Sequence, residues 1–342
     1  MELTLSDGSL CRRLARGLQI LAKVGEDVMI EATPTAICFR SINAAKTAFV
    51  NVSLPSDSFA QYAIKDAEEA CNCRVNAKAM MAPFRSLKSV SQLSLTVGSA
   101  LVVGLDLSDD VDKSFTIALL EGDNMFVSYS RDQCDHTLRA APRFLGDTLA
   151  NMHRDEVTLT VSSEYVVVQS YSTEAPADAG QPAIQASISY QASEFRTFEL
   201  DEDEMQPGTP LELCFAMKEF RAFVEFCDAL DSPLGMHFSI GGAPIVFGID
   251  FDDGRLTAEM IVATVVQESM LGPDQMSQYQ SQISVADSAR YSTPQHVLSH
   301  APSQSQASSR SASQASRSTG SADQRFSSSD QAGFYVASTP LS

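Results

Sequence analysis

Basic side chains, gathered in a few short stretches, are the residues of this sequence whose types and spacing could do chemistry. The first stretch, residues 9–24 (SLCRRLARGLQILAKV), contains Arg12, Arg13, Arg16 and Lys23 and no acid, within a chain of formal net charge −19. Such guanidinium and ammonium groups neutralise phosphates without reading bases. A solvated surface helix is the alternative explanation of any single basic segment.

Three later segments repeat this character, namely residues 76–90, 138–152 and 216–230. Together the four segments hold eleven of the twenty-four basic residues, which are Arg12, Arg13, Arg16, Lys23, Lys78, Arg85, Lys88, Arg139, Arg143, Lys218 and Arg221. The last two segments also contain acids: Asp147, Glu219, Glu225 and Asp228. We therefore expect a phosphate-facing surface that is more positive in the first half of the chain.

Helices must position these side chains, because apolar residues recur at helical spacing within each segment. In the first segment the stripe consists of Leu10, Leu14, Leu18 and Leu21. Pro83 is expected to kink or shorten the second helix. Alternating apolar and polar residues predict strands at 28–31, 36–41, 47–54, 71–75, 92–97, 101–107, 115–120, 157–161, 165–170, 183–190, 211–215, 236–240, 244–251 and 256–265.

The order of these elements repeats along the chain. Each half, of about 130 residues, reads as helix, three strands, helix and three or more strands. The connections are too short for most parallel crossovers, so an α+β fold is expected, with two similar domains that each pack two helices on antiparallel sheets. We predict domain 1 at 1–124, a connector at 125–136, domain 2 at 137–270 and a disordered Ser/Gln-rich tail at 271–342.

Composition and motifs argue against several classes of protein. The sequence has no long apolar run and no leader pattern, so we expect neither a membrane span nor a secretory signal. Seven cysteines are an odd number that suits buried free thiols. We expect no metal, no cofactor and no enzymatic activity, because the usual nucleotide, zinc-protease and nucleophile motifs are missing from the sequence. The acids at 109–112 and 201–204 read as solvated turns.

Several longer motifs resemble a known family. The segments HTLRAAPRFLG (136–146), FAMKEFRAFVEF (215–226), MMAPFRSL (80–87) and FRSINAAKTAF (39–49) look like the Rad-nine subunit of the nine-one-one checkpoint clamp. That subunit has the sliding-clamp fold of proliferating cell nuclear antigen, followed by a Ser-rich tail. The resemblance covers residues 1 to about 270, while the tail matches only in character.

The resemblance implies a heterotrimeric ring with two related subunits, of the Rad-one and Hus-one types, which a clamp loader places around double-stranded DNA in the nucleus. The basic helices would then face DNA non-specifically. Edge strands at 115–120 and 183–190 would join neighbouring subunits. The connector would overlie a client-binding pocket, to which Met125, Phe126, Val127 and Tyr129 would contribute apolar surface unless they pack into the core.

The tail would recruit a BRCT-repeat adaptor once it is phosphorylated, and so activate checkpoint kinase signalling. Candidate sites lie in Ser-Gln pairs and before prolines, at Ser277, Ser281, Thr293, Ser303, Ser305, Ser313 and Thr339. Low-complexity coincidence is the other explanation of these pairs. Phe326, Phe334 and Tyr335 are either apolar anchors for a partner or incidental. Two further functions remain open: a homotrimeric replication processivity clamp and an acidic regulatory scaffold without DNA contact.

Overall fold

The computed structural model describes residues 1–64, 71–85, 90–107, 111–122, 125–150, 152, 155–170, 186–201, 209–265 and 337–338. They belong to one compact unit that comprises Met1–Val266 and Gln331–Ser342. Lys88, the tail phosphorylation candidates and the three aromatic residues near the C-terminus lie outside the described residues. The domain boundaries given above stay a prediction. None of the described helices is long and apolar enough to cross a membrane.

Helix α1 (Gly8–Val24) forms where the leucine spacing predicts it, and its leucine stripe is buried. Asp7 caps the first turn, because its carboxylate accepts hydrogen bonds from the backbone N–H groups of Ser9 at 2.8 Å and Leu10 at 3.2 Å. Gly17 lets the helix approach strand β4 (Ala48–Pro55), since a Cβ at Gly17 would lie only 2.9 Å from a Val52 methyl carbon.

The remaining elements follow the predicted order closely. The first half also contains β1 (Glu2–Leu5), β2 (Asp27–Ala32), β3 (Ala36–Ile42), β5 (Gln61–Ala63), β6 (Cys71–Asn76), α2 (Ala77–Met81), β7 (Val90–Val97), β8 (Ala100–Leu107) and β9 (Asp112–Ala118). The connector contains β10 (Met125–Phe126) and a 3-10 turn, η3 (Arg131–Gln133). The second half contains β11 (His136–Ala140), α3 (Pro142–Ala150), β12 (Glu156–Val161), β13 (Tyr165–Ser170), β14 (Ala186–Gln191), β15 (Thr197–Glu199), β16 (Leu211–Ala216), α4 (Met217–Ala229), β17 (Leu234–Phe238), β18 (Ile245–Asp250) and β19 (Thr257–Val262).

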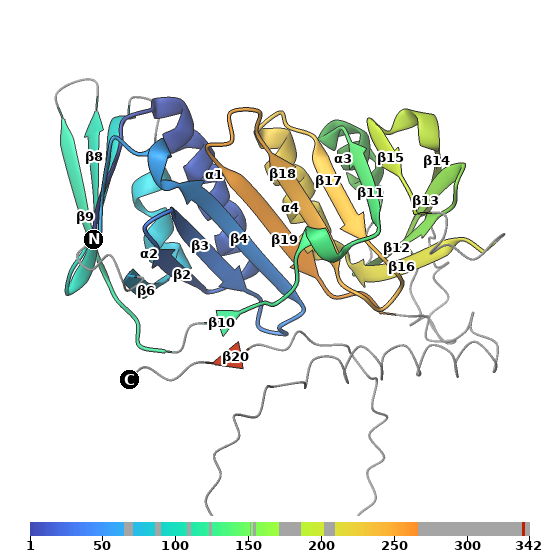
Figure 1. Cartoon of the computed structure of the whole chain (residues 1–342), viewed down its shortest axis with the longest axis horizontal. Helices are drawn as coiled ribbons and strands as arrows, with labels where there is room; N and C mark the ends of the chain where they lie inside the picture. The colour runs from blue at the N-terminus through green and yellow to red at the C-terminus, as the bar shows by residue number, and fades with distance from the viewer. Residues whose placement is uncertain are drawn as a thin grey trace, which may run out of the picture. The chain divides into compact units, whose positions relative to one another are not determined.

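Antiparallel pairing joins these strands into three main sheets (Figure 1). The central sheet has nine strands in the order β15-β11-β17-β18-β19-β4-β3-β2-β6. A five-stranded sheet has the order β5-β1-β7-β8-β9, and a four-stranded sheet has the order β14-β13-β12-β16. The two halves of the chain meet inside the central sheet, where β4 pairs with β19 from Ala48↔Val262 to Ser53↔Thr257. Main-chain hydrogen bonds therefore hold the halves together.

The predicted internal repeat is visible in matched backbone hydrogen bonds. Each of three bonds in the first half has a counterpart in the second half, with N···O distances between 2.8 and 2.9 Å. The pairs are Ala60→Thr4 with Arg196→Arg139, Ser56→Thr35 with Ala192→Glu164, and Ala77→Glu26 with Met217→Asp155. These bonds fix which residues of the two halves are equivalent.

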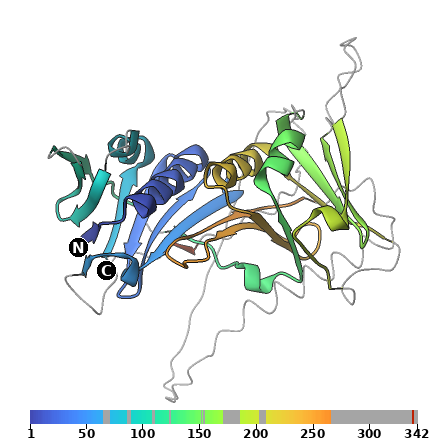
Figure 2. The same ribbon diagram turned by 90° about the horizontal axis from the view of Figure 1, so that it is seen from above.

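The four helices form one row in the order α2, α1, α4, α3, which we call the helix row. Helix α1 packs against α2 on one side and α4 on the other, and α4 packs against α3. Helix α1 also contacts β2, β3 and β4, so the row covers a face of the central sheet. Figure 2 shows α1, in dark blue, and α4, in ochre, on the same side of that sheet. The four predicted helical segments thus pack side by side in the structure.

Two predicted helices have different bounds in the structure. The helix predicted at 138–152 is wrong in its first turn, because residues 138–140 belong to β11, which pairs with β15 and β17. Pro142 explains the boundary, since proline favours the first position of a helix and keeps the preceding residue extended. The helix predicted at 76–90 ends at Met81 and a 3-10 turn, η2 (Pro83–Arg85), follows. Strands β1, β5 and β15 were not expected.

Candidate nucleic-acid interface

The basic side chains of α1 fall into two groups. Arg12 and Arg16 are exposed, on the side of the helix that faces away from the buried leucines. Arg16 donates a hydrogen bond to Gln19 at 2.9 Å. Neither arginine forms an ion pair with any residue that the structure describes. These two guanidinium groups are therefore available to an anionic ligand.

Arg13 instead joins the two halves of the chain. Its guanidinium lies 2.6 Å from the Asp253 carboxylate and 4.3 Å from the centre of the Phe251 ring, and both partners follow β18 in the second half. Only 28% of the Arg13 side chain is exposed. A cation that is held by a carboxylate and an aromatic face contributes less to an external field.

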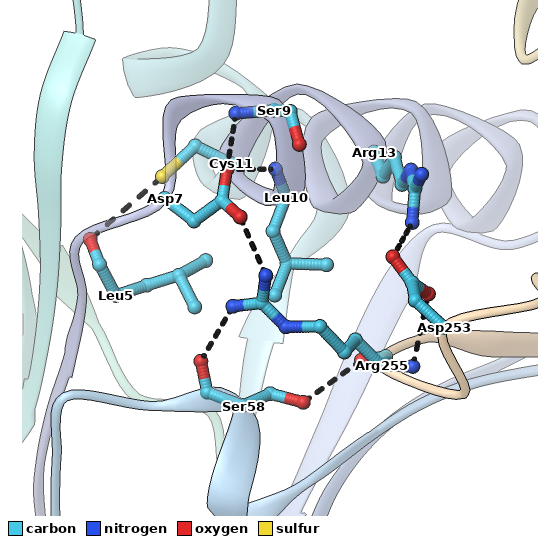
Figure 3. Close-up of polar contacts among 9 residues, drawn as sticks. All are labelled: Leu5, Asp7, Ser9, Leu10, Cys11, Arg13, Ser58, Asp253 and Arg255. Carbon is cyan, nitrogen blue, oxygen red and sulfur yellow. Dashed lines mark hydrogen bonds and ion pairs between the residues drawn. The ribbon is translucent and has the colours of Figure 1, made fainter.

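A second arginine, Arg255, also joins the two halves of the chain, as Figure 3 shows. Arg255 lies 2.5 Å from the Asp7 carboxylate, and it donates a further hydrogen bond to the Ser58 carbonyl at 3.3 Å. The Arg255 guanidinium, together with the backbone N–H groups of Leu10 and Ser9, holds the pKa of Asp7 well below its usual range. The residue that caps α1 is thus also tied to the second half.

Helix α2 and the turn after it present two more free cations. Asn76 caps α2 by accepting hydrogen bonds from the backbone N–H groups of Lys78 at 3.1 Å and Ala79 at 3.2 Å. The side chains of Lys78 and Arg85 are exposed. Within the described part of the chain, neither forms an ion pair. The first half of the helix row is therefore basic.

Acids of α4 form ion pairs with two cations near the second half. Lys23, at the end of α1, lies 2.6 Å from Glu225 of α4. Arg143 of α3 lies 3.4 Å from Asp228 of α4. Lys218 is exposed and has no ion pair to a described residue. The prediction that the second half is less positive agrees with these contacts.

Two of the candidate arginines have other surroundings. Arg221 is partly buried and donates to the Leu149 carbonyl at 2.9 Å and to the Met152 carbonyl, so it ties α4 to the end of α3. Arg139 lies on β11, where the alternating neighbours Leu138 and Ala140 point into the core beneath the helices. Alternation places Arg139 on the opposite face of the central sheet. Neither arginine therefore joins the exposed cations of the helix row.

The connector is docked on the face of the central sheet away from the helices. Val127 and Tyr129 are half-buried against a small apolar cluster of Phe49, Val246 and Ile261. Burial raises the pKa of Tyr129 above its usual range. The side chains of Met125 and Phe126 lie outside the described residues, but their backbone forms β10, which pairs with β20 (Ala337–Ser338).

Arg131 anchors the connector through charge. Its guanidinium lies 2.6 Å from Asp250 and 3.2 Å from Glu259, on strands β18 and β19. Sequence reasoning missed Arg131, Arg255 and Asp253, because each is paired with residues far away in the chain. Only Asp7 had a readable signal, as an aspartate just before a helix.

The two predicted edge strands are at sheet edges, with shifted bounds. The strand predicted at 115–120 is β9 (Asp112–Ala118), and the one predicted at 183–190 is β14 (Ala186–Gln191), with residues 183–185 outside the described part of the chain. In the described part of the chain, β9 is the last strand of the five-stranded sheet and β14 is the last strand of the four-stranded sheet. Each thus leaves one row of backbone N–H and C=O groups without a strand partner. The described residues contain no group of three or more His, Cys, Asp or Glu side chains that could hold a metal ion.

Comparison with solved structures shows the fold. Proliferating cell nuclear antigen from Thermococcus kodakaraensis has a TM-score of 0.60 and 12% identity, and the match covers 77% of this chain and 99% of that one. Proliferating cell nuclear antigen from Entamoeba histolytica has a TM-score of 0.60 and 12% identity, and the match covers 78% of this chain and 98% of that one. A chain of the PCNA2-PCNA3 complex from Sulfolobus tokodaii has a TM-score of 0.59 and 14% identity, and the match covers 77% of this chain and 99% of that one. The chain has the sliding-clamp fold.

Comparison with characterised proteins shows the family. Cell cycle checkpoint control protein Rad9 of Drosophila melanogaster is 26% identical over 282 residues, which cover 81% of this chain and 58% of the relative. Cell cycle checkpoint protein hpr-9 of Caenorhabditis elegans is 21% identical, covering 76% and 52%. DNA repair protein rad9 of Schizosaccharomyces octosporus is 21% identical, covering 80% and 70%. The chain thus spans little more than half the length of the first two relatives. Because the family model for Rad9 matches residues 14–265, this chain belongs to the Rad9 family of checkpoint proteins with a sliding-clamp fold.

Proposed function

We propose that this chain is one subunit of a heterotrimeric ring that encircles double-stranded DNA and signals DNA damage. The observation that carries the proposal is the exposed group of Arg12, Arg16, Lys78 and Arg85 on neighbouring helices, in a chain of net charge −19. Cations concentrated on one surface of an acidic protein suit a polyanionic ligand. An encircling protein needs only weak attraction, because ring closure supplies retention.

Edge strands β9 and β14 supply the ring contacts in this proposal. Main-chain pairing across a sheet edge joins two subunits without a large apolar interface. The sequence of β9 carries two charged residues, Asp112 and Lys113, whereas β14 carries none. Two different edges on one subunit suit a head-to-tail ring, in which one edge of each subunit pairs with the other edge of its neighbour. We propose that the neighbours are subunits of the Rad-one and Hus-one types. A homotrimeric processivity clamp is the alternative, and co-purification of a single kind of subunit would favour it.

The tail acts as a tethered ligand in this proposal. Phosphorylation of the serines in the Ser-Gln pairs adds negative charge that basic residues of a BRCT-repeat adaptor can pair. The adaptor then activates the checkpoint kinase, after a clamp loader has placed the ring on DNA in the nucleus. The checkpoint and repair names of the relatives support this over a replication role.

Charge reversal tests the DNA-facing surface. The assembled ring is prepared with Arg12→Glu/Arg16→Glu, and its affinity for a labelled duplex is measured by fluorescence anisotropy over a range of salt concentrations. We expect a large loss of affinity and a shallower salt dependence, because each phosphate contact contributes about 0.9 to the slope of log K against log salt. The matched control is Arg139→Glu/Arg196→Glu, which changes net charge equally away from the helix row.

The outcomes separate a DNA-facing clamp from an acidic scaffold. Unchanged binding by Arg12→Glu/Arg16→Glu at low salt contradicts the proposal and favours the acidic scaffold. Equal losses in the test pair and the control pair show a general charge effect and also contradict it. For the tail, alanine at Ser277, Ser281, Ser303, Ser305 and Ser313 should leave ring assembly intact and abolish adaptor binding; retained binding would exclude these serines as the tail's functional sites.

A further inference from the structure

The internal repeat puts opposite charges at equivalent positions of the helix row. Thr4 and Arg139 accept equivalent backbone hydrogen bonds. Arg12 lies eight residues after Thr4, and Asp147 lies eight residues after Arg139, so Arg12 and Asp147 are equivalent positions. The alignment agrees with packing, because the buried residues Leu10 and Leu14 of α1 correspond to the buried residues Leu145 and Leu149 of α3.

The second pair of helices shows the same inversion. Ala77 and Met217 begin α2 and α4, and each donates an equivalent hydrogen bond. One residue beyond them are Lys78 and Lys218, so this cation is kept in both halves. Eight residues beyond them are Arg85 and Glu225, where the charge is reversed. An acid of α3 and an acid of α4 thus stand at the sequence positions where the first half has Arg12 on α1 and Arg85 in the turn after α2.

Two exposed acids of α4, Glu225 and Asp228, form ion pairs with cations of the row. In the Lys23–Glu225 pair, 51% and 57% of the side chains are exposed. In the Arg143–Asp228 pair, 80% and 50% are exposed. Ion pairs this exposed add little to folding stability. Their main effect is electrostatic, because each pair cancels a positive charge that would otherwise face the ligand.

The resulting asymmetry is large. Among described residues, the exposed charged side chains of α1, α2 and η2 are five cations and no acid: Arg12, Arg16, Lys23, Lys78 and Arg85. Those of α3 and α4 are two cations and three acids: Arg143, Lys218, Asp147, Glu225 and Asp228. A phosphate that approaches Lys23 competes with Glu225 for its ammonium group, and one that approaches Arg143 competes with Asp228 for its guanidinium group.

We propose that Glu225 and Asp228 keep the second half of the helix row electrostatically neutral, so that a DNA duplex is held against α1 and α2 and is bound weakly enough to slide. The two acids are specificity-determining residues for a polyanion. They set the affinity of this subunit and the side of it that DNA contacts. The inference rests on the proposed function, since it assumes that the helix row faces DNA.

Removing the two charges tests the inference. The assembled ring carries Glu225→Gln/Asp228→Asn, which keeps side-chain size, and its affinity for a labelled duplex is measured by anisotropy against salt. Freeing Lys23 and Arg143 should tighten binding at least about threefold at low salt and steepen the salt slope by up to about 2. The control is Asp57→Asn/Glu199→Gln, two exposed acids in a turn after β4 and on β15, which changes net charge equally.

The two equivalent lysines report where DNA lies. Lys78 and Lys218 are both exposed, so DNA-dependent protection from acetylation can be compared by mass spectrometry within one molecule. We expect DNA to protect Lys78 and to leave Lys218 reactive in the unsubstituted ring. In the Glu225→Gln/Asp228→Asn ring, Lys218 should gain protection. Equal protection of both lysines in the unsubstituted ring overturns the inference.

The outcomes also separate the inference from the proposed function. If Arg12→Glu/Arg16→Glu weakens binding but Glu225→Gln/Asp228→Asn does not tighten it, the helix row faces DNA and only the role of the two acids is wrong. If the control acids tighten binding as much as Glu225 and Asp228 do, net charge explains the effect and the inference fails. Size-exclusion chromatography of each ring confirms that assembly is unchanged.

Discussion

Asp7 makes two stabilising interactions, a helix cap and an ion pair, and substitutions can separate their contributions. Its carboxylate caps α1 and also forms an ion pair with Arg255 of the second half. Asp7→Ala removes both interactions, whereas Asp7→Asn keeps a capping oxygen and removes the charge. Losing the cap costs about 1 kcal/mol. Losing the pair costs at most about 1 kcal/mol, because 35% of each side chain is exposed.

We therefore expect Asp7→Ala to lower the free energy of unfolding by about 1–2 kcal/mol, and Asp7→Asn by less than about 1 kcal/mol. Urea unfolding of the full chain at pH 7 measures both. The m-value serves as a check, because a changed m-value would show that the transition itself has altered. An Asp7→Ala loss below that of Asp7→Asn would refute the assignment of Asp7 as a cap.

The pH dependence has a definite sign. The folded state lowers the pKa of Asp7 below its ordinary value of 3.8, so the unfolded state binds a proton more readily. The stabilisation is complete above that ordinary value and is lost as the pH falls through the lower folded value. The stability difference between the unsubstituted chain and Asp7→Asn should be constant from pH 7 to 5 and narrow below about pH 4. A difference that widens on acidification would contradict the lowered pKa.

Three further substitutions have expected outcomes. Arg221→Ala should lower the free energy of unfolding by about 1–3 kcal/mol in urea titration, since it removes the hydrogen bonds to the Leu149 and Met152 carbonyls. An equal effect of Arg12→Ala would contradict this assignment. Arg131→Ala should speed proteolytic cleavage within the connector at unchanged global stability; unchanged cleavage would show that the ion pairs with Asp250 and Glu259 do not anchor it. Gly17→Val should lower the free energy of unfolding, measured by thermal unfolding, by about 1–3 kcal/mol, because the added atoms overlap Val52. An unchanged stability would show that α1 can move away from β4.

Periodicity was enough to predict most of the fold. The leucines of α1 and the alternating residues of β2, β3 and β4 are local signals that packing reinforces. Prediction failed at residues 138–140, where apolar spacing continues into a helix although Pro142 marks the start of that helix. Short strands such as β1 and β5 carry too few residues for alternation to be recognised.

The candidate site was predictable only as a set of helices. The sequence identifies Arg12, Arg16 and Lys78 as cations on an exposed helix face, and the structure agrees. It cannot distinguish Lys218, which is exposed, from Arg221, three residues later, because the carbonyls that Arg221 binds belong to another helix. Partners that are distant in the chain, such as Asp253 for Arg13, follow from the pairing of β4 with β19.

Retention on circular DNA tests the central claim most directly. The chain is assembled with the two proposed partner subunits, loaded on closed circular duplex, and washed at a salt concentration that screens the basic helices. The account predicts that the ring stays bound to the closed circle and is released when the DNA is cut once, because topology rather than tight binding retains it. Equal retention on closed and cut DNA, or release from both, would contradict an encircling clamp.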